Sequence, residues 1–217
     1  MWTRFFPATV KLCEMLKEGA IGEVQYFHAE MAFNPHDPTR WNIPRLFDRK
    51  QGGGALFDVG VYVLYFASMV FGGEEPEVVT ACSELADTGV DRVTAITLKY
   101  KGGRMAQVSC GIGYDSPREA MIVGQKGTIK VPYPFWCPKR LILPPGEELT
   151  FPSEPPTQAP HPRNFPDSWG LHYEAIEMRK CIEAGKKEAD RMSWKESLMM
   201  AKMMDNILDQ VGVKFDL

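Results

Sequence analysis

A carboxylate and a phenol stand one helical turn apart in the most apolar part of this chain. The stretch "GGGALFDVGVYVLYF" (52–66) opens with three glycines and continues as a buried helix, in which Asp58 precedes Tyr62 by four residues. Side chains at this spacing project from the same face of a helix. An acid and a phenol on one face could together move the proton of a substrate hydroxyl, which is the work of general acid–base catalysis.

Two interpretations of this pair stay open. In the structural one, Asp58 finds a nearby donor and the Tyr62 hydroxyl reaches the surface. In the catalytic one, Tyr62 needs help, because a free tyrosine has a pKa of about 10 and a neighbouring carboxylate disfavours the phenolate. A cation beside the phenol would supply that help. Arg40, Arg45 and Lys50 in the preceding loop are the candidates.

Composition narrows the class of protein. The 217 residues are 44% hydrophobic and 24% charged, enough to build a sizeable core. A formal net charge of −3 without a basic block argues against nucleic acid as a partner. The longest apolar stretch, Val61–Phe71, is shorter than the roughly 20 residues of a membrane span, so no membrane association is predicted. Five scattered cysteines without C-x-x-C spacing favour a reducing cytoplasm, and the four histidines predict no metal site.

The glycine-rich stretches do not form a nucleotide-binding fingerprint. "GGGALF" and "GIGYDS" (111–116) both lack the last glycine of a dinucleotide loop, and "GQKGTI" lacks the G-K-[ST] ending of a P-loop. All three are predicted to be turns. The methionines near the C-terminus, Met199 and Met203, share a helix face with Ile207 and are predicted to pack in the core.

The order of elements predicts an α+β fold, with an open, mostly antiparallel β-sheet and helices on one face. A long loop is expected at 34–54, and the proline-dense stretch 132–167 is expected to be irregular. Helices are predicted at 7–19, 55–71, 168–185 and 193–212, and strands at 22–33, 77–85, 92–100, 103–114, 118–123 and 128–131. The short turns between the later strands favour hairpins.

Several stretches together carry a family resemblance. "MWTRFFP", "GGGALFDVGVY", "VGQKGTIKV…FWCP", "GLHYEAIE" and "ILDQVGVKF" occur in this order along essentially the whole chain. The chain thereby resembles the glucose–fructose oxidoreductase/inositol dehydrogenase (Gfo/Idh/MocA) superfamily. Within it, the closest resemblance is to the dimeric dihydrodiol dehydrogenases, which also oxidise D-xylose with NADP.

The resemblance implies a two-domain, NADP-dependent enzyme whose C-terminal domain carries an open sheet that supports a homodimer. Asp58 and Tyr62 match the family's helix-borne acid and general acid/base. Trp2 and Arg4 match a run near the nicotinamide and are expected to contact the cofactor. Arg45, with Trp136, is expected in a loop near the substrate or the dimer contact, and this loop together with the Phe135–Trp136 tip is expected to assist the dimer.

The resemblance also implies that the family's N-terminal Rossmann domain, with its glycine fingerprint and a lysine beside the catalytic tyrosine, is not in this chain. Residues 1–21 would then be a helix from the end of the Rossmann part, 22–192 the substrate-binding and dimerisation domain, and 193–217 a helix packing back toward the Rossmann side. The chain alone is expected to be inactive and to aggregate, because Leu12, Leu16 and Met203 lie in helices that match segments packing at or near the Rossmann domain and would be exposed without it. The rival hypothesis is a non-catalytic dimeric binding or scaffold module.

Overall fold

The computed structural model describes residues 1–35, 44–151 and 168–215, and its main element is an eight-stranded sheet in the order β2-β3-β4-β1-β5-β6-β7-β8. Only the central pair, β1 with β4, is parallel. The strands are β1 (Val24–Ala32), β2 (Val78–Leu85), β3 (Asp91–Lys99), β4 (Met105–Gly111), β5 (Ala120–Gly124), β6 (Gly127–Val131), β7 (Arg140–Leu143) and β8 (Glu147–Thr150). The predicted open, mostly antiparallel sheet is confirmed.

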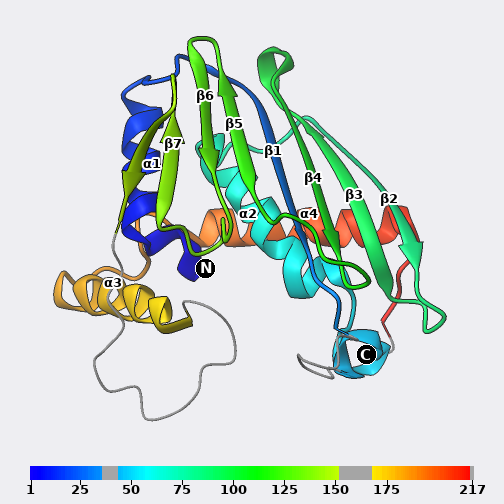
Figure 1. Cartoon of the computed structure of the whole chain (residues 1–217). Helices are drawn as coiled ribbons and strands as arrows, with labels where there is room; N and C mark the ends of the chain where they lie inside the picture. The colour runs from blue at the N-terminus through cyan, green and yellow to red at the C-terminus, as the bar shows by residue number, and fades with distance from the viewer. Residues whose placement is uncertain (36–43, 152–167, 216–217) are drawn as a thin grey trace.

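Helices cover one face of this sheet (Figure 1). Helix α2 contacts β1 and β4, α4 contacts β2, and α1 contacts α2 and β7. The α-helices are α1 (Pro7–Lys17), α2 (Val61–Val70), α3 (His172–Glu183) and α4 (Trp194–Val211). A π-helical turn (Leu56–Gly60) leads into α2, and short 3-10 helices lie at Trp2–Phe5, Pro44–Phe47, Arg49–Gln51, Lys101–Gly103 and Ser168–Leu171.

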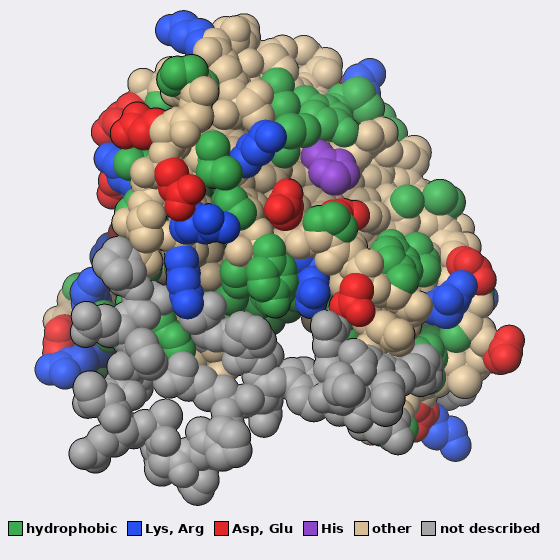
Figure 2. Space-filling model, viewed as in Figure 1, with side chains coloured by type: hydrophobic (Ala, Val, Ile, Leu, Met, Phe, Trp, Pro, Cys, Tyr) green, Lys and Arg blue, Asp and Glu red, His purple; other side chains and the backbone are tan. Residues whose placement is uncertain are grey.

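The alternation of side chains along β1 shows why the sheet has two different faces. Phe27, Ala29 and Met31 are buried on the side of the helices, whereas His28 and Glu30 are half-buried on the other side. Successive side chains of a strand point to opposite faces, so one hydrophobic set builds the core. Hydrophobic side chains also lie scattered among polar ones on the molecular surface in Figure 2.

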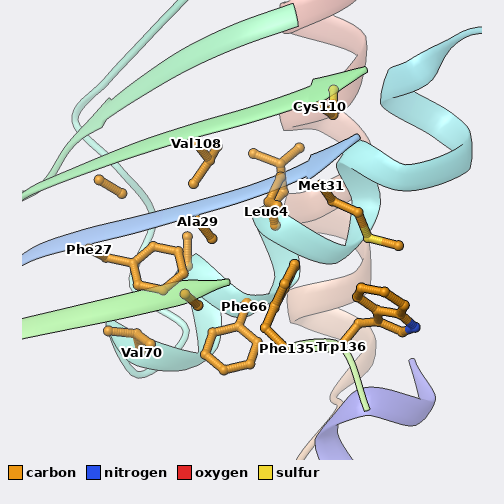
Figure 3. Packing of buried hydrophobic residues seen from close by; sticks show 14 of the residues in the cluster. Phe27, Ala29, Met31, Leu64, Phe66, Val70, Val108, Cys110, Phe135 and Trp136 are labelled. Atoms are coloured by element: carbon orange, nitrogen blue, oxygen red, sulfur yellow. The ribbon is translucent and has the colours of Figure 1, made fainter. Parts of the chain in front are cut away.

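Aromatic rings fill the space between α2 and the sheet (Figure 3). The ring of Phe66 on α2 stacks on Phe27 of β1 at 5.7 Å and meets Phe135 edge-on at 5.5 Å. All three side chains are buried. Rings in these two arrangements contribute more than their buried area alone. This packing fixes α2, and with it Tyr62, relative to the sheet.

The prediction that residues 132–167 are irregular was wrong for part of that stretch. Strands β7 and β8 form a hairpin inside it, and β7 pairs with β6. The prolines that suggested an irregular segment stand beside these strands, with Pro138 before β7 and Pro144 and Pro145 in the hairpin turn. Proline is excluded from the interior of a strand but is compatible with its ends.

The expected exposure of Leu12 and Met203 was also wrong. Leu12 on α1 is fully buried and Met203 on α4 is nearly so, because both helices pack on the rest of this chain. Leu16 is partly buried. Among residues 168–215, the exposed large apolar side chains lie instead on and around α3 and on the first turns of α4. They are Leu171, Ile176, Met178, Ile182, Trp194 and Leu198.

The segment Arg49–Val70 has the length and apolarity of a membrane span, with a mean hydropathy of 1.5 over its best window. Two-thirds of that window, 67%, is buried inside the fold. A core helix has this property, and the packing of α2 on β1 and β4 explains it.

Candidate active site

The glycines that open the α2 region let the backbone pack closely against neighbouring elements. A Cβ on Gly53 would lie 2.6 Å from the carbonyl oxygen of Leu46, and Gly54 adopts a φ of +119° that favours glycine. The chain then enters the π-helical turn Leu56–Gly60, which carries Asp58, before α2 begins at Val61. Single π-helical turns inside helices are frequent at functional sites. The one-turn spacing of Asp58 and Tyr62 survives this irregularity.

The phenol of Tyr62 is half-buried beside Trp2. The indole Nε1 of Trp2 donates a hydrogen bond to the Tyr62 oxygen at 3.1 Å. Among the described residues, the Tyr62 hydroxyl donates no hydrogen bond of its own. Its O–H proton is therefore available to another molecule. The structure thus brings together two of the predicted site residues from chain positions that are 60 residues apart.

Asp58 forms an ion pair with Arg45. The guanidinium Nη2 of Arg45 lies 2.7 Å from Oδ1 of Asp58, and the two side chains are 52% and 20% exposed. The cation that the sequence argument placed beside Tyr62 is thus bound to its acidic neighbour. The ion pair does not cancel the effect of Asp58 on the phenol, because the charge of Asp58 still raises the pKa of Tyr62.

Burial is the main influence on the pKa of Tyr62. Desolvation raises the pKa of this phenol above its usual value, the hydrogen bond from Trp2 lowers it, and the charge of Asp58 raises it further. The phenol is therefore protonated at neutral pH. It is ready to donate a proton, and it needs an additional cation to act as a base.

Arg4, the other residue expected at the cofactor, is buried and fully engaged at its two terminal nitrogens. Nη1 donates to the carbonyl oxygen of Arg191 at 2.8 Å and to Glu196 at 3.0 Å, and Nη2 donates to Glu196 and to the carbonyl oxygen of Tyr65 at 3.2 Å. Ser68 donates to the same carboxylate. Arg4 therefore ties the turn that carries Trp2 to α4, and its predicted contact with a cofactor stays a prediction.

The remaining predicted residues are Trp136, Lys50 and Arg40. Trp136 is nearly buried and packs edge-on against Phe135 and Tyr133, with ring centroids 5.9 and 5.6 Å apart. Phe135 lies in the core, so this pair is not an exposed tip (Figure 3). Lys50 is exposed and its backbone amide donates to Asp48. Arg40 lies outside the described residues.

A buried carboxylate that the sequence analysis did not single out binds the first residue of the π-helical turn that leads into α2. Asp91, at the beginning of β3, is 1% exposed. Its Oδ2 accepts hydrogen bonds from the backbone amide of Leu56 at 2.7 Å and from the Thr94 hydroxyl at 3.1 Å. Burial raises the pKa of this carboxyl to about 6, although the Leu56 amide and Thr94 oppose the rise. No local sequence signal could have found it, because Asp91 and Leu56 are 35 residues apart.

This raised pKa predicts a pH-dependent stability. The folded state holds the Asp91 proton more tightly than the unfolded chain, whose carboxyl has its ordinary pKa near 4. The stabilisation is therefore fully present below about pH 4 and is lost as the pH rises through about 6. Relative to Asp91→Asn, the wild type should gain up to about 3 kcal/mol of unfolding free energy between pH 8 and pH 4.

Urea denaturation of both proteins across this pH range measures the difference. Asp87→Asn, in the exposed turn before β3, is the matched control and should show no such slope. A constant difference between wild type and Asp91→Asn would contradict the raised pKa.

Comparison with known proteins identifies the family. The protein-family model described as the GFO/IDH/MocA C-terminal domain matches residues 9–130 of the sequence. The chain belongs to the Gfo/Idh/MocA family. It is 42% identical over 216 residues to trans-1,2-dihydrobenzene-1,2-diol dehydrogenase of Danio rerio and 35% identical over 215 residues to the Homo sapiens enzyme of the same name. Each alignment covers 99% of this chain and 62% of the relative, so the chain spans about three-fifths of the length of these proteins.

Solved structures agree on the fold of this Gfo/Idh/MocA chain. An aldose-aldose oxidoreductase from Caulobacter crescentus, complexed with glycerol, superposes with a TM-score of 0.72 at 22% identity, covering 97% of this chain and 60% of that one. KijD10, a 3-ketoreductase from Actinomadura kijaniata in complex with NADP, superposes with a TM-score of 0.73 at 20% identity, covering 97% and 61%. The predicted family and fold class are confirmed.

Proposed function

We propose that this chain is the C-terminal portion of an NADP-dependent oxidoreductase that oxidises a secondary alcohol of a sugar, such as D-xylose, or of a trans-dihydrodiol, with Tyr62 as the general acid/base. The observation that carries the proposal is the Tyr62 hydroxyl, which accepts from Trp2, donates to no described residue, and stands one turn after the ion-paired Asp58. The relatives named dihydrodiol dehydrogenases and the NADP-complexed ketoreductase support the substrate class and the cofactor.

In this mechanism, the substrate hydroxyl binds to the open side of the Tyr62 phenol. A bound NADP would supply the acceptor for the hydride of the carbinol carbon. In the reductive direction the protonated Tyr62 phenol gives its proton to the carbonyl oxygen. In the oxidative direction the phenol must first lose that proton, with the help of the additional cation that it needs, and the phenolate then takes the hydroxyl proton as the carbonyl forms. Trp2 holds the phenol oxygen in place, and its N–H stabilises negative charge there. Arg45 binds Asp58 and so holds its carboxylate one turn before Tyr62.

The described residues fit only one side of a cofactor site. Trp2 lies beside Tyr62, where it can line the space next to a nicotinamide ring. Arg4 fits poorly as a direct phosphate ligand, because its terminal nitrogens are taken up by Glu196 and two backbone carbonyls. In the proposal Arg4 acts indirectly, by fixing the turn that holds Trp2.

Two proteins compared side by side test the proposal. We expect residues 1–217 alone to bind NADP with a Kd above about 10 μM (about −7 kcal/mol) and to produce no NADPH from D-xylose or a trans-dihydrodiol. The glycine turn that receives a pyrophosphate is absent from its sequence. A fusion that places the N-terminal segment of the Danio rerio relative before residue 1 should produce NADPH from one of these substrates. Absorbance of the reduced cofactor and calorimetric titration give both readouts.

Two outcomes of that comparison would contradict the proposal. Tight NADP binding or turnover by residues 1–217 would contradict the assignment of the chain as one half of the enzyme. An inactive fusion that still binds NADP would contradict the catalytic role of Tyr62 and favour the rival hypothesis, a dimeric binding or scaffold module.

A second copy of this chain is the partner that we propose for the uncovered face of the sheet. The middle of this face carries the uncharged side chains of Thr80, Ala95, Thr97 and Ser109, and Glu84, Lys99 and Lys130 lie on the same face. A broad sheet face that no helix covers is a candidate interaction site. The residues around its central hollow include His28, Thr80, Thr97, Gln107 and Ser109. Light scattering should show a dimer at tens of micromolar, a range set by ordinary interface affinities, and Thr97→Arg should shift it to monomer. A monomeric wild type would contradict this assembly.

The cytoplasm is the compartment that we propose for the protein. No disulfide joins the five cysteines, all of which lie in the described part of the chain. Cys110 and Cys137 are buried, and Cys82 is exposed on β2. Cysteines that form no disulfide are what a reducing compartment maintains.

A further inference from the structure

We infer that Asp91 is a positioning residue for the Asp58–Tyr62 pair: it holds the start of the π-helical turn and so sets where both groups stand. The role in catalysis rests on the proposed function of Tyr62, whereas the positioning itself can be tested without any activity. The backbone amides at the start of this helix have no partners inside the helix itself.

The start of the π-helical turn has no local cap. Ala55, the residue before the turn, provides no side-chain hydrogen bond to the amides that follow. Asp91 does this from another element, with its Oδ2 on the Leu56 amide at 2.7 Å. The Thr94 hydroxyl, also on β3, donates to the same oxygen at 3.1 Å and keeps the carboxylate turned toward the helix. A carboxylate at the amino end of a helix also interacts favourably with the helix dipole.

Close packing transmits this contact to the whole turn. A Cβ on Gly54 would lie 2.1 Å from Oδ1 of Asp91, so the glycine backbone rests directly on the carboxylate. At the other end of the turn, a Cβ on Gly60 would lie 2.8 Å from the sulfur of Cys110 on β4. The turn is therefore fixed at both ends against the sheet. Asp58 lies between these two points.

The same contact reaches the cation of the site. The amide of Gly54 donates to the carbonyl oxygen of Leu46 at 2.8 Å, and a Cβ on Gly53 would lie 2.7 Å from the carbonyl oxygen of Arg45. A shift of Gly54 away from Asp91 would therefore move the Arg45 turn as well. Asp91 in this way sets the position of Arg45 relative to Asp58. One helical turn further on, Asp91 also sets the position of Tyr62 relative to Trp2.

The direct test uses nitrogen-15-labelled residues 1–217 and two local readouts. The first is hydrogen exchange of the Leu56 amide, and the second is the Nε1–H resonance of Trp2, assigned with Trp2→Phe. In Asp91→Ala, the Leu56 amide should exchange about tenfold faster or more, the expected effect of losing a hydrogen bond to a charged acceptor. The Trp2 resonance should move as its bond to Tyr62 changes. Amides in β6 are the control for a general loss of stability. Once the change in global unfolding is subtracted, their exchange rates should be those of the wild type.

Three further variants keep the test decisive. Asp91→Asn retains an oxygen acceptor and should restore both readouts, whereas Asp87→Ala, an exposed carboxylate removed from the same turn, should change neither. Thr94→Ala should move both readouts in the direction of Asp91→Ala but less, and it replaces that variant if the latter does not fold. Wild-type exchange at Leu56 together with a wild-type Trp2 resonance, in Asp91→Ala or in its replacement, would overturn the inference.

Activity measurements on the fusion separate positioning from mere stability. If Tyr62 is the acid/base, Asp91→Ala should lower kcat without changing the affinity for NADP. It should have no further effect on kcat in the Tyr62→Phe background. An inactive fusion would count against the proposed function and leave the two local readouts to decide the role of Asp91. Equal effects of Asp91→Ala in both backgrounds would contradict positioning of Tyr62.

Discussion

Replacement of Tyr62 by Phe should lower the turnover of the active fusion by about 10²- to 10⁴-fold, the usual contribution of a general acid/base. The change removes only the hydroxyl, which accepts from Trp2 and donates to no described residue. The ring keeps its packing, so the fold should stay intact. The affinity for NADP should barely change, because in the proposal the phenol contacts the reacting hydroxyl. Steady-state kinetics and calorimetric titration of NADP measure the two quantities.

Tyr65→Phe is the matched control, because Tyr65 lies on the same helix and contributes its backbone carbonyl, not its hydroxyl, to the contact with Arg4. Its turnover should stay within a few-fold of wild type. Trp2→Phe should fall between the two, since it removes the N–H that holds the phenol oxygen. Near-normal turnover of Tyr62→Phe would exclude this phenol as the acid/base.

The part of the site that could be predicted from the sequence is the part set by local spacing. Asp58 and Tyr62 are four residues apart in an apolar helix, and one-turn spacing places them on one face whatever surrounds them. The sequence also identified Arg40, Arg45 and Lys50 in the preceding loop as candidate cations for the site. It could not say that Arg45 would pair with Asp58 at 2.7 Å, because that choice depends on how the loop packs.

The contacts that fix the site in space were beyond the reach of sequence reasoning. The bond from Trp2 to Tyr62 joins residues 60 apart, and the bond from Leu56 to Asp91 joins residues 35 apart. The bond from Leu56 to Asp91 depends on the order of strands in the sheet, which places β3 beside β4 and brings its first residue under the π-helical turn. The bond from Trp2 to Tyr62 depends on how the 3-10 helix Trp2–Phe5 packs beside α2. Hairpin spacing predicted most of the strands. It did not predict the parallel pairing of β1 with β4 at the centre of the sheet.

The buried pair of Arg4 and Glu196 should be the most sensitive electrostatic contact in the fold. Their side chains are 7% and 11% exposed, and the guanidinium and carboxylate bind each other through both terminal nitrogens and both oxygens. Removing one partner of such a pair leaves an uncompensated buried charge, so Arg4→Met or Glu196→Gln should lower the unfolding free energy by about 3 to 5 kcal/mol. Arg4→Met also removes the donors on the carbonyl oxygens of Arg191 and Tyr65.

Replacing both Arg4 and Glu196 tests whether the loss of unfolding free energy comes from an uncompensated charge or from lost packing and hydrogen bonds. Arg4→Met combined with Glu196→Met buries two apolar side chains of similar length and should recover the part of the loss that comes from the uncompensated charge. The part that comes from the carbonyl oxygens of Arg191 and Tyr65 and from the Ser68 hydroxyl, which keep no partner in this contact, should remain. The exposed pair of Arg92 and Glu84, joined at 2.7 Å, is the control, and Glu84→Gln should change the unfolding free energy by no more than about 1 kcal/mol. Urea denaturation at pH 7 measures the four variants and the wild type. Since Arg4 fixes the turn that carries Trp2, the single variants should also shift the Trp2 resonance, and a large loss of stability without that shift would show that Arg4 does not support the site.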